Sequence, residues 1–116
     1  MLRQVLRAKI HGATVTDASV EYTGSITIDE ALLKASGIAP YERVLVGDLS
    51  NGERFTTYAI AGKKNSGMVC VNGAAAKLVN VGDKLIIMCF GIVDERELKV
   101  HKPSIVYVNE KNRIVK

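Results

Sequence analysis

Hydrophobic and polar positions alternate along short stretches of this chain, and turn-forming residues separate the stretches. Such alternation is typical of half-buried strands. The predicted strands cover residues 5–10, 13–16, 20–22, 25–28, 43–49, 54–61, 68–71, 84–93 and 104–108. Asn51-Gly52 is a strong hairpin signal between two of them, and residues 110–112 form a weaker one. The pattern favours a small, mainly β barrel.

Three segments depart from the strand pattern and predict helices. Residues 27–30 have the form of a capping box that starts at Thr27, residues 31–35 are good helix formers, and Gly37 suits a left-handed cap. Residues 73–79 and 94–100 predict shorter helices, the second ending before Lys102, which precedes a proline. The helices are therefore few and short.

Length and charge narrow the class of protein. A chain of 116 residues suits a single domain. The net charge of +4 would suit nucleic acid or a small anion, but basic residues are scattered and aromatic residues do not interleave with them. We therefore expect a small anionic substrate and no nucleic acid.

Apolar runs and cysteines indicate the compartment. The longest apolar run, residues 85–93, is too short to cross a bilayer, and residues 1–20 lack the features of a signal peptide. Cys70 and Cys89 have neither CxxC nor metal-ligand spacing, so we expect reduced core thiols and no metal. A soluble cytoplasmic protein without membrane contact follows as the expectation.

The Gly24-Ser25 bond is a candidate for self-cleavage. A serine hydroxyl can attack the preceding carbonyl, and glycine there removes the Cβ that would crowd the attack. Elimination from the resulting ester breaks the chain, and hydrolysis then leaves a pyruvoyl group, an electrophilic ketone. The same dipeptide is also common in simple turns, so other residues must decide between the two interpretations.

Strand alternation gathers further candidates. It places Lys9 with His11 on one face, and Arg54 with Tyr58 on another, while Thr57 faces the opposite side. A solvated strand face would give the same pattern. Beyond these strands, Asn72, Gly73, Ala74 and Ala75 stand at a predicted helix start, where free N–H groups can bind a carboxylate. A plain turn is the alternative there.

Taken together, these motifs resemble the pyruvoyl-dependent aspartate 1-decarboxylase family. The motifs are Lys9-Ile10-His11, Tyr22-x-Gly24-Ser25-x-x-Ile28-Asp29, Asn51-Gly52-x-Arg54-Phe55-x-Thr57-Tyr58, Val71-Asn72-Gly73-Ala74-Ala75 and Val81-Gly82-Asp83. The resemblance runs from the N-terminus to about Phe90 and resumes over residues 101–104. It implies a six-stranded double-psi β-barrel in a homotetramer, with active sites between subunits.

The resemblance also implies an activity. The chain would cleave itself into residues 1–24 and 25–116, and Ser25 would become the pyruvoyl cofactor, with neither metal nor pyridoxal phosphate. L-Aspartate would form a Schiff base with the ketone and lose carbon dioxide to give β-alanine for pantothenate and coenzyme A. In this reaction the cofactor accepts the electron pair that decarboxylation releases.

Residue roles follow from the same resemblance. Tyr58 would donate the proton, and the cations of Lys9 and Arg54 would bind substrate carboxylates. The remaining site residues would be Thr57 for processing and substrate contact, Asn72 for orienting the Schiff base, Gly73, Ala74 and Ala75 for lining the pocket, and His11 and Tyr22 for support.

Some features lie outside this pattern. Gly47 stands where some relatives carry a bulky aromatic residue, which leaves the local packing open, and His101 falls outside the predicted site. Two alternatives to an active enzyme stay open at this point. One is a non-catalytic β-barrel that binds a partner or nucleic acid, and the other is a precursor that never matures.

Overall fold

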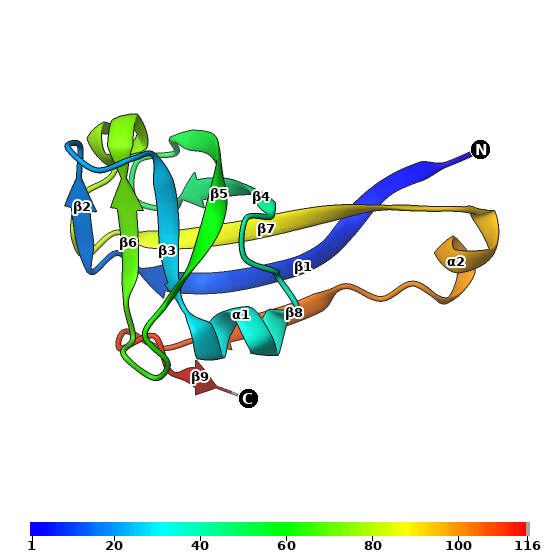
Figure 1. Ribbon diagram of the computed structural model, residues 1–116. Coiled ribbons are helices and arrows are strands. Elements are labelled where there is room, and N and C mark those ends of the chain that lie inside the picture. The colour runs from blue at the N-terminus through cyan, green and yellow to red at the C-terminus, as the bar shows by residue number, and fades with distance from the viewer. Residues whose placement is uncertain (116) are drawn as a thin grey trace.

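The computed structural model describes residues 1–115, and strands dominate its architecture (Figure 1). The strands are β1 (Arg3–Thr14), β2 (Asp17–Ser19), β3 (Ser25–Asp29), β4 (Arg43–Asp48), β5 (Arg54–Gly62), β6 (Val69–Asn72), β7 (Lys84–Val93), β8 (Ser104–Val108) and β9 (Ile114–Val115). Hydrogen bonds join them in the order β2-β6-β3-β5-β4-β7-β1-β8-β9. The mainly β, single-domain prediction is confirmed.

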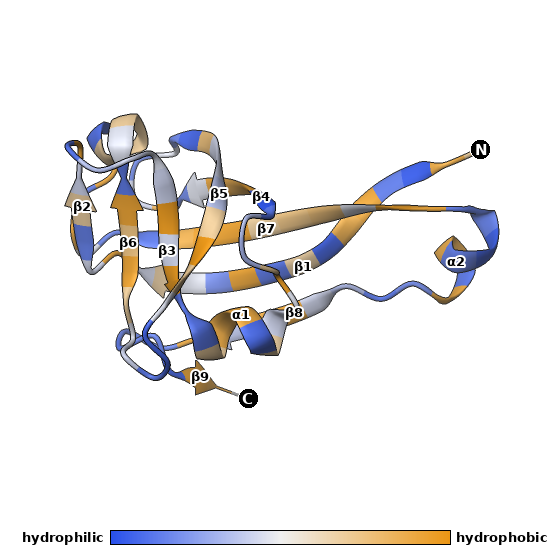
Figure 2. Ribbon diagram, viewed as in Figure 1, coloured by the Kyte–Doolittle hydropathy of each residue, from blue (hydrophilic) through white to orange (hydrophobic). Residues whose placement is uncertain are grey.

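This sheet folds over on itself and encloses the core. Figure 1 shows β3, β5 and β6 running steeply across β1 and β7. Alternate residues from both halves are fully buried between them, among them Ile10, Ile26, Val46 and Ile87. In Figure 2, the ribbons of these strands carry long stretches in the colour of hydrophobic residues. The hydrogen-bonded ladder does not close over residues 1–115, so the six-stranded double-psi barrel stays a prediction.

Two strand predictions need correction. Residues 5–10 and 13–16 were expected as separate strands, but β1 continues through Gly12, which has φ +89° beside a register shift. A bulge therefore replaces the expected break. Residues 20–22 form a turn instead of a strand, with Tyr22 67% exposed, and the neighbouring strand is β2, which pairs with β6.

The helices match their predicted places. Helix α1 (Glu30–Ser36) ends at Gly37 in the left-handed conformation, as expected. Its N-cap is Asp29, which accepts the Ala31 N–H, so the capping box predicted from Thr27 is wrong. The 3₁₀ helix η1 (Gly73–Leu78) and helix α2 (Glu95–Val100) occupy the two shorter segments.

Both predicted turns are present. Gly52 adopts φ +78° between β4 and β5, which pair antiparallel. Asn112 adopts φ +60° between β8 and β9, and its buried side chain also bonds the backbone of Thr14 and Gly67. The C-terminal turn therefore ties β1 to the loop before β6.

An arm extends away from this body. It comprises the start of β1, the end of β7 and α2, and gives the molecule a longest dimension of 43 Å (Figure 1). Helix α2 buries none of its residues. Over residues 1–115, no helix combines the length and apolar character that a membrane crossing requires.

The cysteines are free, as predicted. Cys89 is buried in the core as predicted, whereas the core position predicted for Cys70 is wrong, because Cys70 is only partly buried on the outer side of β6. Burial raises the pKa of Cys89, and the carboxylate of Glu42 adds to this while Arg7 opposes it.

Candidate active site

Ser25 is the first residue of β3, and only 2% of it is exposed. Asn72 lies directly opposite on β6 and donates from Nδ2 to Ser25 Oγ at 3.2 Å and to Thr27 Oγ1 at 3.2 Å. Ser25 Oγ also lies 3.4 Å from the Thr23 carbonyl oxygen. These contacts keep the hydroxyl on the outer side of the sheet, next to the bond that precedes it.

The backbone of Gly73 packs directly against Gly24. A Cβ on Gly73 would lie 2.5 Å from Gly24 Cα and 2.8 Å from Gly24 N, and Gly73 has φ +79°. Glycine is therefore favoured at position 73 for two reasons: a Cβ would overlap the Gly24 backbone, and the positive φ is unfavourable for other residues. A Cβ on Gly24 itself would meet an ordinary contact, 3.9 Å from the Asn72 carbonyl oxygen.

Other predicted residues surround this contact. The Tyr22 carbonyl oxygen would lie 3.3 Å from the same Cβ on Gly73, and Ala74 and Ala75 follow Gly73 in η1. The structure thus brings together seven predicted site residues, which we call the Ser25 cluster: Tyr22, Gly24, Ser25, Asn72, Gly73, Ala74 and Ala75.

Strand β5 places Tyr58 beside this cluster. It runs parallel to β3 with Ile26 next to Ala59, so the preceding residues, Ser25 and Tyr58, share the outer side of neighbouring strands. Thr57 faces inward opposite the buried Val44. The predicted alternation of β5 is confirmed.

Arg54 lies on the same face as Tyr58 but at the far end of the strand. It is exposed and stands opposite Gly47 of β4. Four residues along a strand correspond to about 13 Å. Arg54 therefore does not come near Ser25 within one chain.

Lys9 and His11 also share an outer face, as predicted, because Ala8 and Ile10 are fully buried. Lys9 lies between Met88 and Ile105, and the His11 ring packs on Tyr107 with centroids 5.5 Å apart. Strands β7 and β4 separate β1 from β5, a span of roughly 14 Å along the sheet. One chain does not bring these two residues to Ser25.

Three neighbours of the site were missed in the sequence. Thr27 shares the Asn72 amide with Ser25, and strand alternation could have revealed it. Tyr41 stacks on Tyr58, and Arg43 lies opposite Tyr58 on β4. No local pattern could reveal these two, because they depend on which strands and loops become neighbours.

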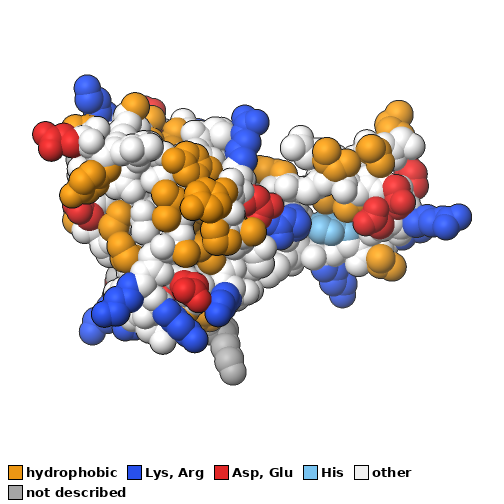
Figure 3. Space-filling view, in the orientation of Figure 1, with side chains coloured by type: hydrophobic (Ala, Val, Ile, Leu, Met, Phe, Trp, Pro, Cys, Tyr) orange, Lys and Arg blue, Asp and Glu red, His pale blue; other side chains and the backbone are white. Residues whose placement is uncertain are grey.

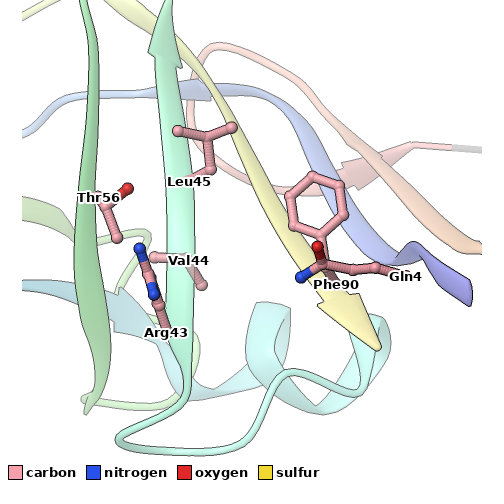
Figure 4. A pocket seen from close by; sticks show the side chains of 6 residues that line it. All are labelled: Gln4, Arg43, Val44, Leu45, Thr56 and Phe90. Carbon is pink, nitrogen blue, oxygen red and sulfur yellow. The ribbon is translucent and has the colours of Figure 1, made fainter. Parts of the chain in front are cut away.

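Arg43 also lines a hollow of about 410 Å³ on the outer side of the sheet. Figure 4 shows Arg43 and Leu45 on β4 beside Thr56 on β5, with Phe90 and Gln4 across from them. This hollow offers one cation and mostly neutral side chains. It is a recess next to Tyr58, separate from the Ser25 cluster.

Charged groups with shifted pKa values stabilise the frame around the site. Burial works to raise the pKa of Asp29, but the N–H groups of Gly67, Ala31 and Asn65 lower it below the ordinary value. These bonds fix the end of β3, the strand that begins with Ser25. Within residues 1–115, no group of three His, Cys, Asp or Glu side chains is placed to bind a metal ion.

Fold and site together define a small, mainly β domain with a buried serine. The glycine before this serine packs against a second glycine, and a tyrosine lies beside the serine on the adjoining strand. The family model for aspartate decarboxylase matches residues 1–115. The chain belongs to the aspartate decarboxylase family.

Individual relatives agree. The aspartate 1-decarboxylase of Caldicellulosiruptor saccharolyticus is 55% identical over 116 residues, which cover 100% of this chain and 91% of the relative. That of Syntrophus aciditrophicus is 54% identical over 114 residues, 98% of each chain. That of Lactiplantibacillus plantarum is 53% identical over 116 residues, 100% of this chain and 89% of the relative.

Proposed function

We propose that this protein is a pyruvoyl-dependent aspartate 1-decarboxylase. L-Aspartate would lose its α-carboxylate as carbon dioxide and gain a proton at the same carbon, giving β-alanine for pantothenate and coenzyme A. Family membership over the full described length supports the activity. The observation that carries the proposal for the site is the Ser25 hydroxyl, buried and bonded to Asn72 beside the Gly24–Gly73 contact.

The chain's own residues suit the formation of the cofactor. Ser25 Oγ would attack the Gly24 carbonyl carbon, which turns the amide into an ester. Loss of the Ser25 Cα proton then expels Gly24 as a free carboxylate, and hydrolysis of the remaining dehydroalanine releases ammonia and leaves the pyruvoyl. Asn72 supports this proposal, because its amide donates to the buried Ser25 Oγ on the outer side of β3 and so orients it.

When formed, the ketone would bind the substrate amine and accept the electron pair released with carbon dioxide. Tyr58 lies on the strand next to that of Ser25, and its Oη would hold the proton that replaces the departing carboxylate. Asn72 would contact the site from β6, and Thr57, whose side chain faces inward on β5, would keep the processing and substrate role that the family resemblance implies. The small residues Gly73, Ala74 and Ala75 would leave room for a compact substrate.

Carboxylate binding would come from Arg54 and Lys9, with His11 and Tyr22 as support. Arginine and lysine suit a dicarboxylate, since a substrate with one carboxylate would leave a desolvated cation unpaired. Arg54 and Lys9 lie far from Ser25 within one chain. This separation supports active sites assembled between subunits of a homotetramer, which we propose together with a cytoplasmic location.

Intact-mass measurement tests the proposal. We expect purified protein to yield two fragments, residues 1–24 and 25–116, with a hydrazide-reactive ketone on the larger fragment and β-alanine formed from aspartate. Ser25→Ala should remain one chain and lack activity. Ser104→Ala, at an exposed serine that starts β8, is the matched control and should cleave normally. Light scattering should give about four times the 12.6 kDa chain mass.

Each outcome bears on a different part of the proposal. A chain that stays whole after prolonged incubation and forms no β-alanine would contradict the self-processing enzyme. Complete cleavage without decarboxylation would retain the processing chemistry but reject aspartate as the substrate. A monomer with full activity would reject the shared sites.

A further inference from the structure

Tyr41 has an unusual backbone and an unusual exposure. It lies in the loop between α1 and β4 with φ +70°, a left-handed conformation that a bulky side chain rarely adopts. Its side chain is 77% exposed, so burial in the core does not explain the conformation. Such strain persists only where the surrounding structure imposes it, and it is enriched at functional sites.

Two backbone hydrogen bonds impose this conformation, and both involve the neighbour of Tyr58. Tyr41 N donates to the Ala59 carbonyl at 2.7 Å, and Ala59 N donates to the Glu42 carbonyl at 3.0 Å. The loop is therefore attached to β5 on the residue that follows Tyr58.

The side chain of Glu42 anchors the same loop from the other side. Its carboxylate accepts hydrogen bonds from Arg7 Nη2 and from Ala39 N, the latter at 2.9 Å. Burial acts to raise the pKa of Glu42, but the hydrogen bonds from Ala39 N and Arg7 and the nearby Cys89 thiol lower it below the ordinary value. Glu42 thus stays ionised and keeps the strained loop in place.

The ring of Tyr41 then lies on the ring of Tyr58. Their centroids are 6.5 Å apart and their planes are inclined by 25°, an offset-stacked arrangement. Figure 3 shows side chains of the hydrophobic class, which includes tyrosine, gathered over this part of β5. Because Tyr58 lies on an outer sheet face, its ring would otherwise have few neighbours to restrict it.

We propose that Tyr41 is a positioning residue for Tyr58: its ring, fixed by the strained loop, restricts the Tyr58 phenol to one orientation beside Ser25. This inference rests on the proposed function, in which Tyr58 supplies the proton. The Tyr41 hydroxyl plays no part, so phenylalanine at position 41 retains the effect. Asparagine tolerates the left-handed backbone and removes the ring.

The first test needs no active enzyme. The uncleaved Ser25→Ala protein contains four tyrosines, and ¹³C labels in their rings should give a separate signal for each. Tyr41→Asn should shift the Tyr58 ring signals and speed the flipping of that ring, whereas Tyr41→Phe should leave both close to the parent. Unchanged Tyr58 signals in Tyr41→Asn would overturn the contact and the proposal with it.

The second test uses the mature enzyme. Loss of an aromatic pair should lower kcat of Tyr41→Asn roughly threefold to tenfold, with KM within about twofold of the parent. Tyr41→Phe should restore kcat. In a Tyr58→Phe background, Tyr41→Asn should cause no further loss, because the ring acts only through the Tyr58 hydroxyl. Thermal stability should not fall in Tyr41→Asn, which rules out general unfolding as the cause.

The outcomes separate this inference from the proposed function. Parental kcat in Tyr41→Asn, with a large loss in Tyr58→Phe, would overturn the positioning role alone. If Tyr58→Phe turned over at the parental rate, Tyr58 would not be the proton donor. The role proposed for Tyr41 in positioning it would then fail as well. Equal losses in Tyr41→Asn and Tyr41→Phe would show that the hydroxyl matters, which also contradicts positioning by the ring.

Discussion

The Ser25 cluster and the outer face of β4, β5 and β7 differ most clearly at their glycines. In the cluster, a Cβ on Gly73 would overlap the Gly24 backbone. On the outer face, a Cβ on Gly47 would have no atom of residues 1–115 within 4 Å, and a hollow of about 220 Å³ lies beside Gly47, Arg54, Ile86 and Met88. We call this second region the open face.

The difference matches the chemistry proposed for each region. Cleavage of the Gly24-Ser25 bond requires one hydroxyl at a fixed place, and close packing with hydrogen bonds provides that within a single chain. The open face carries a proposed carboxylate-binding residue, Arg54, which is exposed at the edge of this hollow. In the proposed homotetramer, a second subunit would cover this hollow. Four substitutions test this contrast.

The largest effect is expected for Gly73→Ala. The added methyl group overlaps Gly24 Cα and also has to adopt φ +79°, so we expect a loss of about 2 kcal/mol or more in the free energy of unfolding. Self-cleavage should slow at least about tenfold, because Gly24 has to move. Chemical denaturation and an intact-mass time course measure both.

Gly82→Ala is the matched control for Gly73→Ala. Gly82 has φ +95°, but within the described part of the chain a Cβ there would meet no atom within 4 Å. This variant should lose stability through its backbone conformation and still cleave at the parental rate. Equal slowing of cleavage in both variants would mean that the Gly73–Gly24 contact has no specific role.

The second effect is expected for Asn72→Ala. Among residues 1–115 it removes the only side-chain donor to Ser25 Oγ and Thr27 Oγ1, so cleavage should slow several-fold while stability falls by about 1 to 2 kcal/mol. Asn51→Ala is the control, since Asn51 also makes two side-chain bonds but lies in the β4–β5 turn. If Asn51→Ala slowed cleavage equally, lost stability rather than orientation of Ser25 would be the cause.

Local features of the two regions could be predicted from the sequence. Alternation assigned Lys9, His11, Arg54, Thr57 and Tyr58 to their correct faces, because it follows from the geometry of a single strand. The hairpin glycine Gly52 and the cap glycine Gly37 were equally local.

Contacts between distant segments could not be predicted in this way. The packing of Gly73 on Gly24 and of Tyr41 on Tyr58 joins residues far apart in the chain, and strand order decides both. Val20–Tyr22 had the composition of a strand, but its neighbour Asp17–Ser19 takes the place beside β6. Tertiary pairing overrides local propensity there.

The third effect concerns Asp48, which follows Gly47 and faces inward, 3% exposed. Burial raises its pKa and the neighbouring Asp83 carboxylate adds to this, and Oδ2 of Asp48 is buried without a hydrogen-bond partner among residues 1–115. The folded state therefore favours the protonated form of Asp48. The stabilisation linked to this raised pKa is fully present below pH 3.8, the ordinary pKa of the carboxyl group. It is lost as the pH rises through the higher pKa of the folded state.

Asp48→Asn should remove this pH-dependent loss of stability, since the amide stays neutral across this pH range and its Oδ1 can still accept the Ser50 N–H. We expect a higher melting temperature than the parent at pH 7, by a few degrees, and little difference near pH 3. Thermal melts across this pH range measure it. A variant that is less stable than the parent at pH 7 would show that Asp48 is ionised and favourably bonded in the folded protein.

The smallest effect is expected for Gly47→Ala, which tests the open face directly. Alanine loses less backbone freedom on folding than glycine and meets no atom within 4 Å, so stability should rise by about 0.5 to 1 kcal/mol, with cleavage unchanged. Thermal melts at low and high protein concentration measure this gain. If alanine raises the stability at both protein concentrations, the open face leaves room for a methyl group even when subunits associate. If alanine instead destabilises the protein only at high concentration, a second copy packs on Gly47, and the face would be open in one chain but filled in the assembly.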